Sequence, residues 1–316
     1  MRKRFFSVII PVYNRAHRLP YVLKSLKNQT FQDFETIIVD DASTDNSYQV
    51  ALDYDLQNKV VLRNERNCER CVTRNRGIAV AKGQYICFLD SDDYHLPEHF
   101  QKLHDFIVYK KEPVAFIFTN QYAETDDGVR TIKESPNYEE YNPYFYFLRY
   151  TVNPQRWAVH RNIIQHIHFD ENVIIAEDMD VSLRIVAAGY PVFQFKEEHT
   201  VYVAASDSFT HGDPSKIEKE LFYFKRIIQK KELSGKIPRR AIRYFYSQCY
   251  FHMSQKCYDK QQRWQTWKYS IKSFCLFPQG YDDNFRNNKI LFVNCIYSIP
   301  ILGNVIKRIH QRNRYA

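Results

Sequence analysis

The segment Phe6–Asn14 reads FSVIIPVYN, an apolar run rich in β-branched residues that ends at once in polar side chains. The same pattern returns in ETIIVDD (residues 35–41) and in YICFLDSDD (residues 85–93). Apolar runs without alternation are typical of strands that are covered on both faces, as in a parallel sheet. We therefore predict three buried strands, each followed by a loop that carries hydrogen-bonding side chains.

Helical patterns lie between these strands. Apolar residues recur at helical spacing over residues 19–26, residues 71–81 form a similar segment before Gly83, and Pro97 opens another. Weaker strand patterns cover residues 59–62 and 114–119, and Ser43 or Thr44 is expected to cap the helix that precedes residue 59. Strands that alternate with single helices imply right-handed crossovers. The sequence predicts an α/β fold, with a Rossmann-type, mostly parallel sheet flanked by helices.

The second half of the chain has a different organisation. A helix is expected over residues 178–188, before Gly189, and short strands over residues 192–195 and 201–204. From residue 215 the pattern is helical, and its aromatic residues, Trp264 and Trp267 among them, are expected to lie mostly in a helical core. We therefore expect an α/β domain over residues 1–214 and a basic, aromatic-rich helical region over residues 215–316.

The charge of the chain is unevenly distributed. Its 316 residues carry a net charge of +9, but residues 1–224 hold 26 Lys and Arg against 32 Asp and Glu, whereas residues 225–316 hold 19 against 4. Such asymmetry indicates a polyanion or an anionic membrane as the partner of the basic region. A solvated basic face on a helical region is the alternative.

Several classes of protein and of segment are excluded. The eight glycines never stand two residues apart, so there is neither a dinucleotide fingerprint nor a phosphate loop, which excludes the usual dehydrogenases and P-loop ATPases. Seven irregularly spaced cysteines in a long chain favour reduced thiols in a cytosolic setting. The apolar run that follows Arg4 stops at Pro11 without a cleavage site, so a first strand is favoured over a signal peptide. The longest apolar stretch, residues 290–306, is too interrupted to span a bilayer but could lie in its interface.

Polar residues follow the three predicted strands at one edge of the sheet, where ligands of such folds bind. Asp90 and Asp92, one residue apart, can offer oxygen ligands to Mg²⁺ or Mn²⁺, which would also bind a substrate diphosphate. An Asp-rich turn is the structural alternative. A carboxylate of the pair Asp40–Asp41 could accept the N–H of a uracil-like base.

Six segments in order resemble family 2 inverting glycosyltransferases with the GT-A fold, over residues 5–205. They are SVIIPVYN (7–14), QTF (29–31), IVDDASTD (38–45), RNRG (74–77), GQYI (83–86) and FLDSDD (88–93). Ordered blocks at family spacing are far more specific than any one motif.

The resemblance implies roles for individual residues. The expected nucleotide-binding residues are Pro11, Tyr13, Asn14, Asp41, Arg74 and Ser91. Asp90 and Asp92 would bind the metal, with His211 as a further ligand, although Val203 and Ala205 stand where the family often has Arg and His.

The pair Glu177–Asp178 resembles the catalytic acidic block of the family, with Asp178 as the base, whereas helix capping is the structural alternative. Trp157, His160 and Glu177 are placed for contacts with the acceptor; for Trp157 and His160, core packing is the other possibility.

The resemblance therefore predicts a Mn²⁺- or Mg²⁺-dependent inverting glycosyltransferase of bacterial type. It would move a hexose or an N-acetylhexosamine from a UDP-sugar to a glycan, with a lipid-linked acceptor in cell-surface polysaccharide synthesis. The enzyme would lie in the cytoplasm, peripherally on the inner face of the cell membrane, and homodimer formation stays open. The alternatives are another donor such as dTDP-rhamnose, a nucleic-acid-binding module, which lacks a supporting motif, and a protein whose GT-A domain is inactive.

Overall fold

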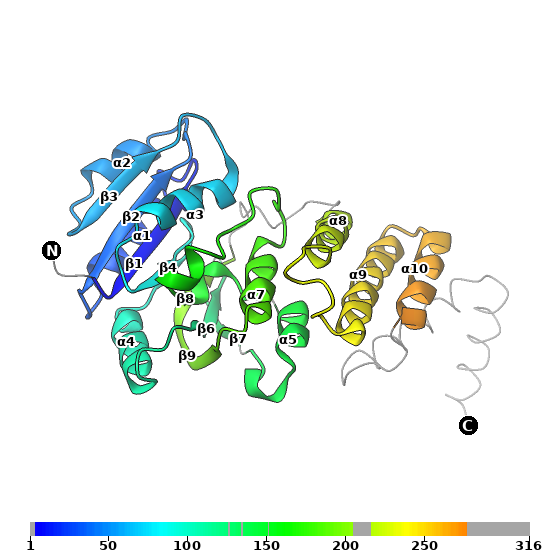
Figure 1. Ribbon diagram of the computed structural model, residues 1–316. Helices are drawn as coiled ribbons and strands as arrows, with labels where there is room; N and C mark the ends of the chain where they lie inside the picture. Colours follow the sequence, from blue (N-terminus) through cyan, green and yellow to red (C-terminus); the bar gives the residue numbers. More distant parts are fainter. Residues whose placement is uncertain (1–3, 126, 134, 151, 205–215, 277–316) are drawn as a thin grey trace, which may run out of the picture. The chain divides into compact units, whose positions relative to one another are not determined.

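A computed structural model describes residues 4–125, 127–133, 135–150, 152–204 and 216–276 (Figure 1). One nine-stranded sheet lies within these residues. Its strands are β1 (Phe6–Val12), β2 (Phe34–Asp40), β3 (Lys59–Arg63), β4 (Tyr85–Phe88), β5 (Tyr94–His95), β6 (Phe116–Glu124), β7 (Arg130–Lys133), β8 (Trp157–His160) and β9 (Val192–Val203).

The strand order is β3-β2-β1-β4-β8-β6-β9-β5, with β7 paired to β6 beside this path. The first four strands are mutually parallel, as predicted. Strand β8 then runs antiparallel to both β4 and β6, while β6 and β9 are parallel. The expected α/β sheet is therefore confirmed, with a parallel half of Rossmann type and a mixed half.

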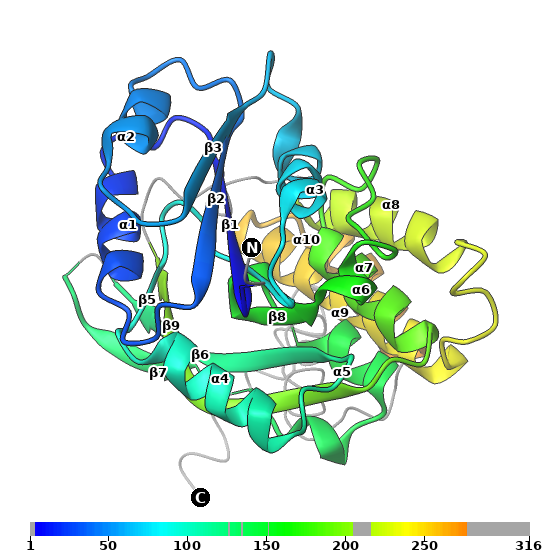
Figure 2. The ribbon, with the colours of Figure 1, turned by 60° about the vertical axis from the view of Figure 1, so that its left-hand side comes forward.

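The α-helices are α1 (Leu19–Lys27), α2 (Ser47–Asp53), α3 (Glu69–Val80), α4 (His99–Tyr109), α5 (Pro143–Arg149), α6 (Arg161–Ile164), α7 (Glu177–Ala187), α8 (Lys216–Ile228), α9 (Arg239–Asp259) and α10 (Arg263–Leu276). Short 3₁₀ helices cover Tyr138–Glu140 and Pro154–Arg156. Figure 2 shows α1 and α2 on one side of β1–β3 and α3 on the other.

Both faces of β1 are buried, as its unbroken apolar run indicates. Val8 and Ile10 belong to the core that α1, α2 and α4 cover. Ile9 faces α3, where a Cβ atom added to Gly77 would lie 2.5 Å from its Cγ2. The glycine therefore allows α3 to lie close to the strand.

The predicted cap of α2 is wrong. The helix begins at Ser47, and its N-cap residue Asn46 makes no side-chain cap hydrogen bond. Ser43 Oγ instead accepts the backbone N–H of Asn14 at 3.0 Å, and the N–H of Thr44 donates to Asn14 Oδ1 at 2.8 Å. These two side chains tie the loop after β2 to the loop after β1.

The two short strands expected over residues 192–195 and 201–204 are one strand, β9. Its pairing with β6 shifts register on either side of Asn120. The connecting residues Lys196–His199 are polar, and Lys196 and Glu197 are exposed, so they have no apolar pattern from which a strand could be predicted.

The contacts within the chain divide it into two compact units. The first comprises residues 1–213 and 226–236, and the second comprises residues 214–225 and 237–316. The sequence predicted one boundary, after residue 214. In the structure, residues 226–236 lie in the first unit, which was not predicted.

Two further expectations concern single residues of the chain. All six cysteines in the described part are free, and Cys295 lies outside it. The expectation that Trp264 lies in a helical core is wrong, because its side chain is 69% exposed, whereas Tyr244 is buried.

No helix in the described ranges combines enough length and apolar character to cross a bilayer. The apolar stretch over residues 290–306 lies outside those ranges.

Candidate active site

The loops after β1, β2 and β4 meet at the carboxyl edge of the parallel strands. The backbone N–H of Asp41 donates to Val12 O at 2.7 Å, and that of Leu89 donates to Ile9 O at 3.0 Å. Arg15, in the loop after β1, lies 3.8 Å from Asp92 Oδ2. The three polar loops predicted to converge are therefore brought together.

Asp41 is 4% exposed at this edge, and its Oδ1 atom is occupied within the chain. That oxygen accepts hydrogen bonds from Asn64 Nδ2 at 2.6 Å and from the backbone N–H of Cys68 at 2.9 Å. Asn64 and Cys68, both in the loop between β3 and α3, were not predicted, because only the fold brings that loop to Asp41. Pro11 is half-buried nearby in β1, and Tyr13 is 44% exposed.

Arg74 on α3 joins two acidic loops. Its guanidinium is 3% exposed, donates to Asp90 Oδ1 at 2.8 Å and to Glu177 Oε1 at 3.1 Å, and lies 5.3 Å from the centroid of the Phe169 ring. Burial alone would lower the pKa of Arg74, but the charges of Asp90 and Glu177 raise it above its usual value. The residue expected to face a nucleotide is thus an ion-paired bridge between the β4 loop and α7.

Three aspartates follow β4 with different surroundings. Asp93 is buried and accepts the backbone N–H of Val203 at 2.9 Å. Burial and the charge of Asp90 raise the pKa of both Asp92 and Asp93. Ser91, which lies between Asp90 and Asp92, is buried.

Asp90 and Asp92 suit a divalent cation in part. Burial and, after it, the charge of Asp90 raise the pKa of Asp92, and the positive charge of a bound cation would favour the ionised form of both carboxyls. Within the described ranges, no three His, Cys, Asp or Glu side chains are grouped as metal ligands, and His211 lies outside those ranges. Two carboxylates together with substrate phosphates form an ordinary Mg²⁺ site, so the donor set fits a metal that arrives with a diphosphate.

Asp178 lies in the first turn of α7, beside Glu177. It is half-buried, and burial together with the charge of Glu177 raises its pKa to about 7. Its Oδ1 accepts the backbone N–H of Met179 at 2.8 Å. A carboxylate with such a pKa is a suitable general base near neutral pH.

Several loops of this edge contain residues in the left-handed conformation. Positive φ angles occur at Asn14 (51°), Ala42 (58°), Glu69 (70°) and Ala176 (66°). Ala42 follows Asp41, and Ala176 precedes the Glu177–Asp178 pair. Strained backbone of this kind is typical of functional sites.

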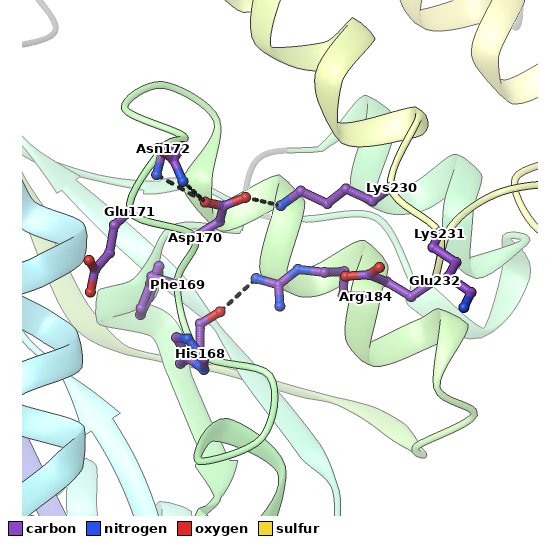
Figure 3. A pocket seen from close by; sticks show the side chains of 9 residues that line it. All are labelled: His168, Phe169, Asp170, Glu171, Asn172, Arg184, Lys230, Lys231 and Glu232. Atoms are coloured by element: carbon purple, nitrogen blue, oxygen red, sulfur yellow. Dashed lines mark hydrogen bonds and ion pairs between the residues drawn. The ribbon is translucent and has the colours of Figure 1, made fainter.

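A second group of charges contacts α7, and Figure 3 shows three of its members, Lys230, Asp170 and Arg184. Lys230 Nζ lies 2.7 Å from Asp170 Oδ2 and 2.7 Å from Asp180 Oδ1, and Arg184 also pairs with Asp180 at 2.8 Å. Asp180 is fully buried. The pairs lie at a surface cavity of about 510 Å³ whose lining residues are His168, Phe169, Asp170, Glu171, Asn172, Arg184, Lys230, Lys231 and Glu232. None of the predicted site residues lines it.

Two of the three residues considered for acceptor contacts, Trp157 and His160, pack in the chain. Trp157 is 2% exposed, stacks on Phe169 at 5.9 Å and donates its indole N–H to Val152 O at 2.8 Å. His160 lies opposite Tyr85, at the amino end of β4 and away from the site edge, and its Nδ1 accepts the N–H of Asn162. For both residues the arrangement is that of core packing, whereas Glu177 is part of the Arg74 bridge.

Comparison with known proteins shows relatives of the sequence. The profile of glycosyl transferase family 2 matches residues 7–167. An uncharacterized glycosyltransferase of Methanocaldococcus jannaschii is 29% identical over 197 residues, which are 60% of this chain and 67% of the relative. The glycosyltransferase GlyG of Streptococcus pneumoniae is 34% identical over 163 residues, 51% of this chain and 48% of the relative.

Solved structures share the fold. The crystal structure of S. aureus TarS 1–349 in complex with UDP-GlcNAc superposes with a TM-score of 0.63 at 21% identity, covering 86% of this chain and 81% of TarS. The mannosyltransferase PcManGT from Pyrobaculum calidifontis, in complex with GDP-Man and Mn²⁺, gives 0.58 at 14% identity, covering 93% and 80%. With the matched profile over half of its length, the chain belongs to glycosyl transferase family 2.

Proposed function

We propose that the chain is an inverting glycosyltransferase that moves a hexose or an N-acetylhexosamine from a UDP-sugar to a glycan acceptor. The observation that carries the proposal is the position of Asp178 directly beside Glu177, which Arg74 pairs with Asp90 at the end of β4. Burial and the charge of Glu177 raise the pKa of Asp178 to about 7, which supports its role as a base. Arg74 links the neighbouring Glu177 to Asp90 at the end of β4, so a base and a diphosphate site would be held together.

Asp178 would accept the proton of the acceptor hydroxyl as the hydroxyl oxygen attacks the anomeric carbon. The attack comes from the face opposite the leaving diphosphate, which inverts the configuration. A general base works best when its pKa is close to the operating pH. The Arg74 bridge would hold the start of α7 in position, because Glu177 and Asp178 are adjacent in the same helical turn.

The nucleotide would lie across the loops after β1 and β2. Oδ1 of Asp41 already accepts two hydrogen bonds, so the second carboxylate oxygen would accept the N–H of the base. The ends of β1 and β4 would contribute further contacts to the nucleotide, from Pro11, Tyr13, Asn14 and Ser91. In support of the uracil nucleotide, TarS was solved with UDP-GlcNAc and with UDP.

Asp90 and Asp92 would hold Mn²⁺ or Mg²⁺ together with the diphosphate. When bound, the cation would supply positive charge to the departing nucleoside diphosphate. The PcManGT complex contains Mn²⁺, which supports the choice of metal. A third ligand such as His211 stays part of the proposal.

The acceptor would be a lipid-linked glycan in the synthesis of a polysaccharide. Two relatives support this: the amylovoran biosynthesis glycosyltransferase AmsB of Erwinia amylovora, and WfaP of Escherichia coli, a β-1,3-glucosyltransferase that acts on GlcNAc-diphosphoundecaprenol. The chain is 30% and 32% identical to them, over 66% and 51% of their lengths. The enzyme would then lie in the cytoplasm, peripherally on the inner membrane face.

Other donors are the main alternative. A dTDP-sugar such as dTDP-rhamnose would use the same edge, and PcManGT was solved with GDP-Man. A nucleic-acid-binding role is disfavoured by the carboxylates of Asp41, Asp90 and Asp92 at the site, since a phosphate backbone requires positive charge.

Calorimetry with UDP, dTDP and GDP, each with and without Mn²⁺, tests the site. We expect UDP to bind most tightly, to require the metal, and to lose at least about tenfold in affinity in Asp92→Ala. The exposed acid Asp105 provides the control variant Asp105→Ala, which should bind as wild type. If Asp92→Ala leaves metal-dependent UDP binding unchanged, the proposed metal site is wrong. The donor sugar is identified by a separate experiment, in which a panel of nucleotide sugars is scored by release of the nucleotide.

A further inference from the structure

Helices α9 and α10 of the second unit pack on each other through small hydroxyl side chains. Ser247 Oγ donates to Ser273 O at 2.9 Å, and Ser254 Oγ lies 2.6 Å from Ser270 Oγ. These four serines are at most 8% exposed. The face by which α10 contacts α9 therefore contains polar side chains, beside a stack of Tyr250 on Tyr269 at 6.1 Å between ring centroids.

A neighbouring face of α10 carries large apolar residues. Trp264 is 69% exposed, Ile271 is 37% exposed and Phe274 is 44% exposed. Trp267, at 5.0 Å from Trp264 between ring centroids, stacks on it. These residues recur at intervals of three and four, so they form one stripe along the helix. A surface helix whose outer face meets only water has polar residues on that face and turns its apolar stripe to the protein core.

The charge around this stripe has one sign. Lys268 and Lys272 are exposed on α10, and α10 contains no Asp or Glu. Over residues 237–276 there are eight Lys and Arg against one Asp. A row of apolar residues that includes two tryptophans, with lysines and no acidic residue on the same helix, is typical of helices that lie in the interface of an anionic bilayer, because Trp favours the headgroup boundary and basic side chains pair with the headgroups. Trp is also common at protein interfaces, so a protein partner is a competing outcome of the test below.

We propose that α10 is a membrane-docking helix, which inserts the stripe of Trp264, Trp267, Ile271 and Phe274 into the interface of an anionic bilayer, with Lys268 and Lys272 among the headgroups. The docking itself follows from the surface of α10; its use in bringing a lipid-linked acceptor to the enzyme rests on the proposed function. Helix α10 is a different segment from residues 290–306, for which the sequence alone suggested a contact with the bilayer interface.

Flotation of the full-length protein with vesicles tests the docking. We expect binding to phosphatidylcholine vesicles that contain phosphatidylglycerol, weakening as salt rises, and little binding to phosphatidylcholine alone. The double variant Trp264→Gln/Ile271→Gln should lower the partition coefficient at least about tenfold. Lys268→Gln and Lys272→Gln should lower it about fivefold each. Tyr109→Gln, which removes a 79% exposed aromatic side chain on α4, is the matched control and should bind as wild type.

Tryptophan fluorescence locates the contact. The chain has three tryptophans, and Trp157 is buried in the first unit, so a change in emission on vesicles reports Trp264 and Trp267. We expect a blue shift and quenching by lipids brominated along their acyl chains, both of them reduced in Trp264→Gln.

Three results would overturn the proposal: no binding of the wild-type chain to anionic vesicles at low salt, binding that the double variant leaves unchanged, or a stripe whose removal converts a dimer into a monomer without a change in flotation. Metal-dependent UDP binding, measured on the same variants, should stay at the wild-type level. A wild-type chain that binds UDP but does not float would thus contradict the docking alone, whereas a chain that floats but does not bind UDP would contradict the proposed function alone.

Discussion

Asp178 combines a half-buried carboxyl with an acidic neighbour, and both raise its pKa to about 7. A base with this pKa is protonated below pH 7 and ionised above it. The rate of glycosyl transfer should therefore fall as the pH falls below about 7 and reach a plateau above it. An ordinary surface carboxylate would move this limb to a pH near 4.

Asp178→Asn should leave UDP binding nearly unchanged and lower kcat by about 10²–10⁴-fold, because the amide has the same shape but cannot accept a proton. The acidic limb of the pH profile should disappear with it. Steady-state kinetics from pH 5 to 9 on the variant and on the control Asp105→Asn provides the measurement. If Asp178→Asn transfers sugar at the wild-type rate, the residue only caps α7 and the base lies elsewhere.

Site residues that directly follow a strand could be predicted from the sequence. Asp41 and Asp90 come at the ends of apolar runs, and a parallel sheet places such ends at one edge. The pairing of Arg74 with Glu177 could not be predicted, since the two are 103 residues apart and only the packing of α3 beside α7 joins them. The same holds for Asn64, which lies 23 residues from Asp41.

At the scale of elements, α7 is held by ion pairs at its buried side. Lys230, from the segment that follows α8, contacts both Asp170 and Asp180, while Arg184 shares Asp180. Asp180 is one helical turn or less from Asp178, so these contacts fix the end of the helix that carries the proposed base.

Lys230→Met should destabilise the first unit by roughly 2 kcal/mol, since it removes two charged hydrogen bonds and leaves Asp180 with Arg184 alone. We also expect kcat to fall while the affinity for UDP changes little. Lys231→Met is the matched control, because Lys231 is exposed and lines the same cavity. Denaturant unfolding and kinetics on both variants measure the effects. Equal stability of the two variants would show that the Lys230 pairs contribute nothing.

The strength of the local pattern determined which elements could be predicted. β1, β2 and β4 are buried apolar runs, and α1 has its four predicted apolar residues in the core. The four-residue β8 was not predicted, because WAVH is too short to show a period and its place between β4 and β6 depends on distant strands. The two-residue β5 gives no signal at all.

For the whole molecule, the two units have separate cores. The first is built around the sheet, and the second contains buried residues such as Phe224, Ala241 and Tyr244. All of the proposed nucleotide-binding residues belong to the first unit. A ligand of that site should therefore stabilise one unit and not the other.

Calorimetric unfolding should accordingly show two transitions. UDP with Mn²⁺ at about 100 times its Kd should stabilise the first unit by about 2.7 kcal/mol and leave the other transition in place. The comparison of scans with and without the nucleotide gives the shift directly. A single transition that moves as a whole would mean that the units unfold together.

The organisation of the chain could be predicted only in outline. The change from alternating strands and helices to a purely helical pattern, together with the change in charge, indicated a division near residue 214. The return of residues 226–236 to the first unit depends on contacts such as Lys236 Nζ with Ala187 O, which no composition shift announces.

The residues with positive φ at the carboxyl edge of the parallel strands affect how the enzyme can be made more stable to heat. An alanine with positive φ costs about 1 kcal/mol or more, which glycine would relieve, so Ala42→Gly and Ala176→Gly are inviting substitutions for a thermostability screen. Yet these positions adjoin Asp41 and the Glu177–Asp178 pair, and the relieved loops would have more freedom to leave the reactive geometry. A screen that scores survival alone would select such changes at the expense of turnover. Directed evolution of this scaffold should therefore measure product formed after heating, and seek its gains in loops away from the carboxyl edge.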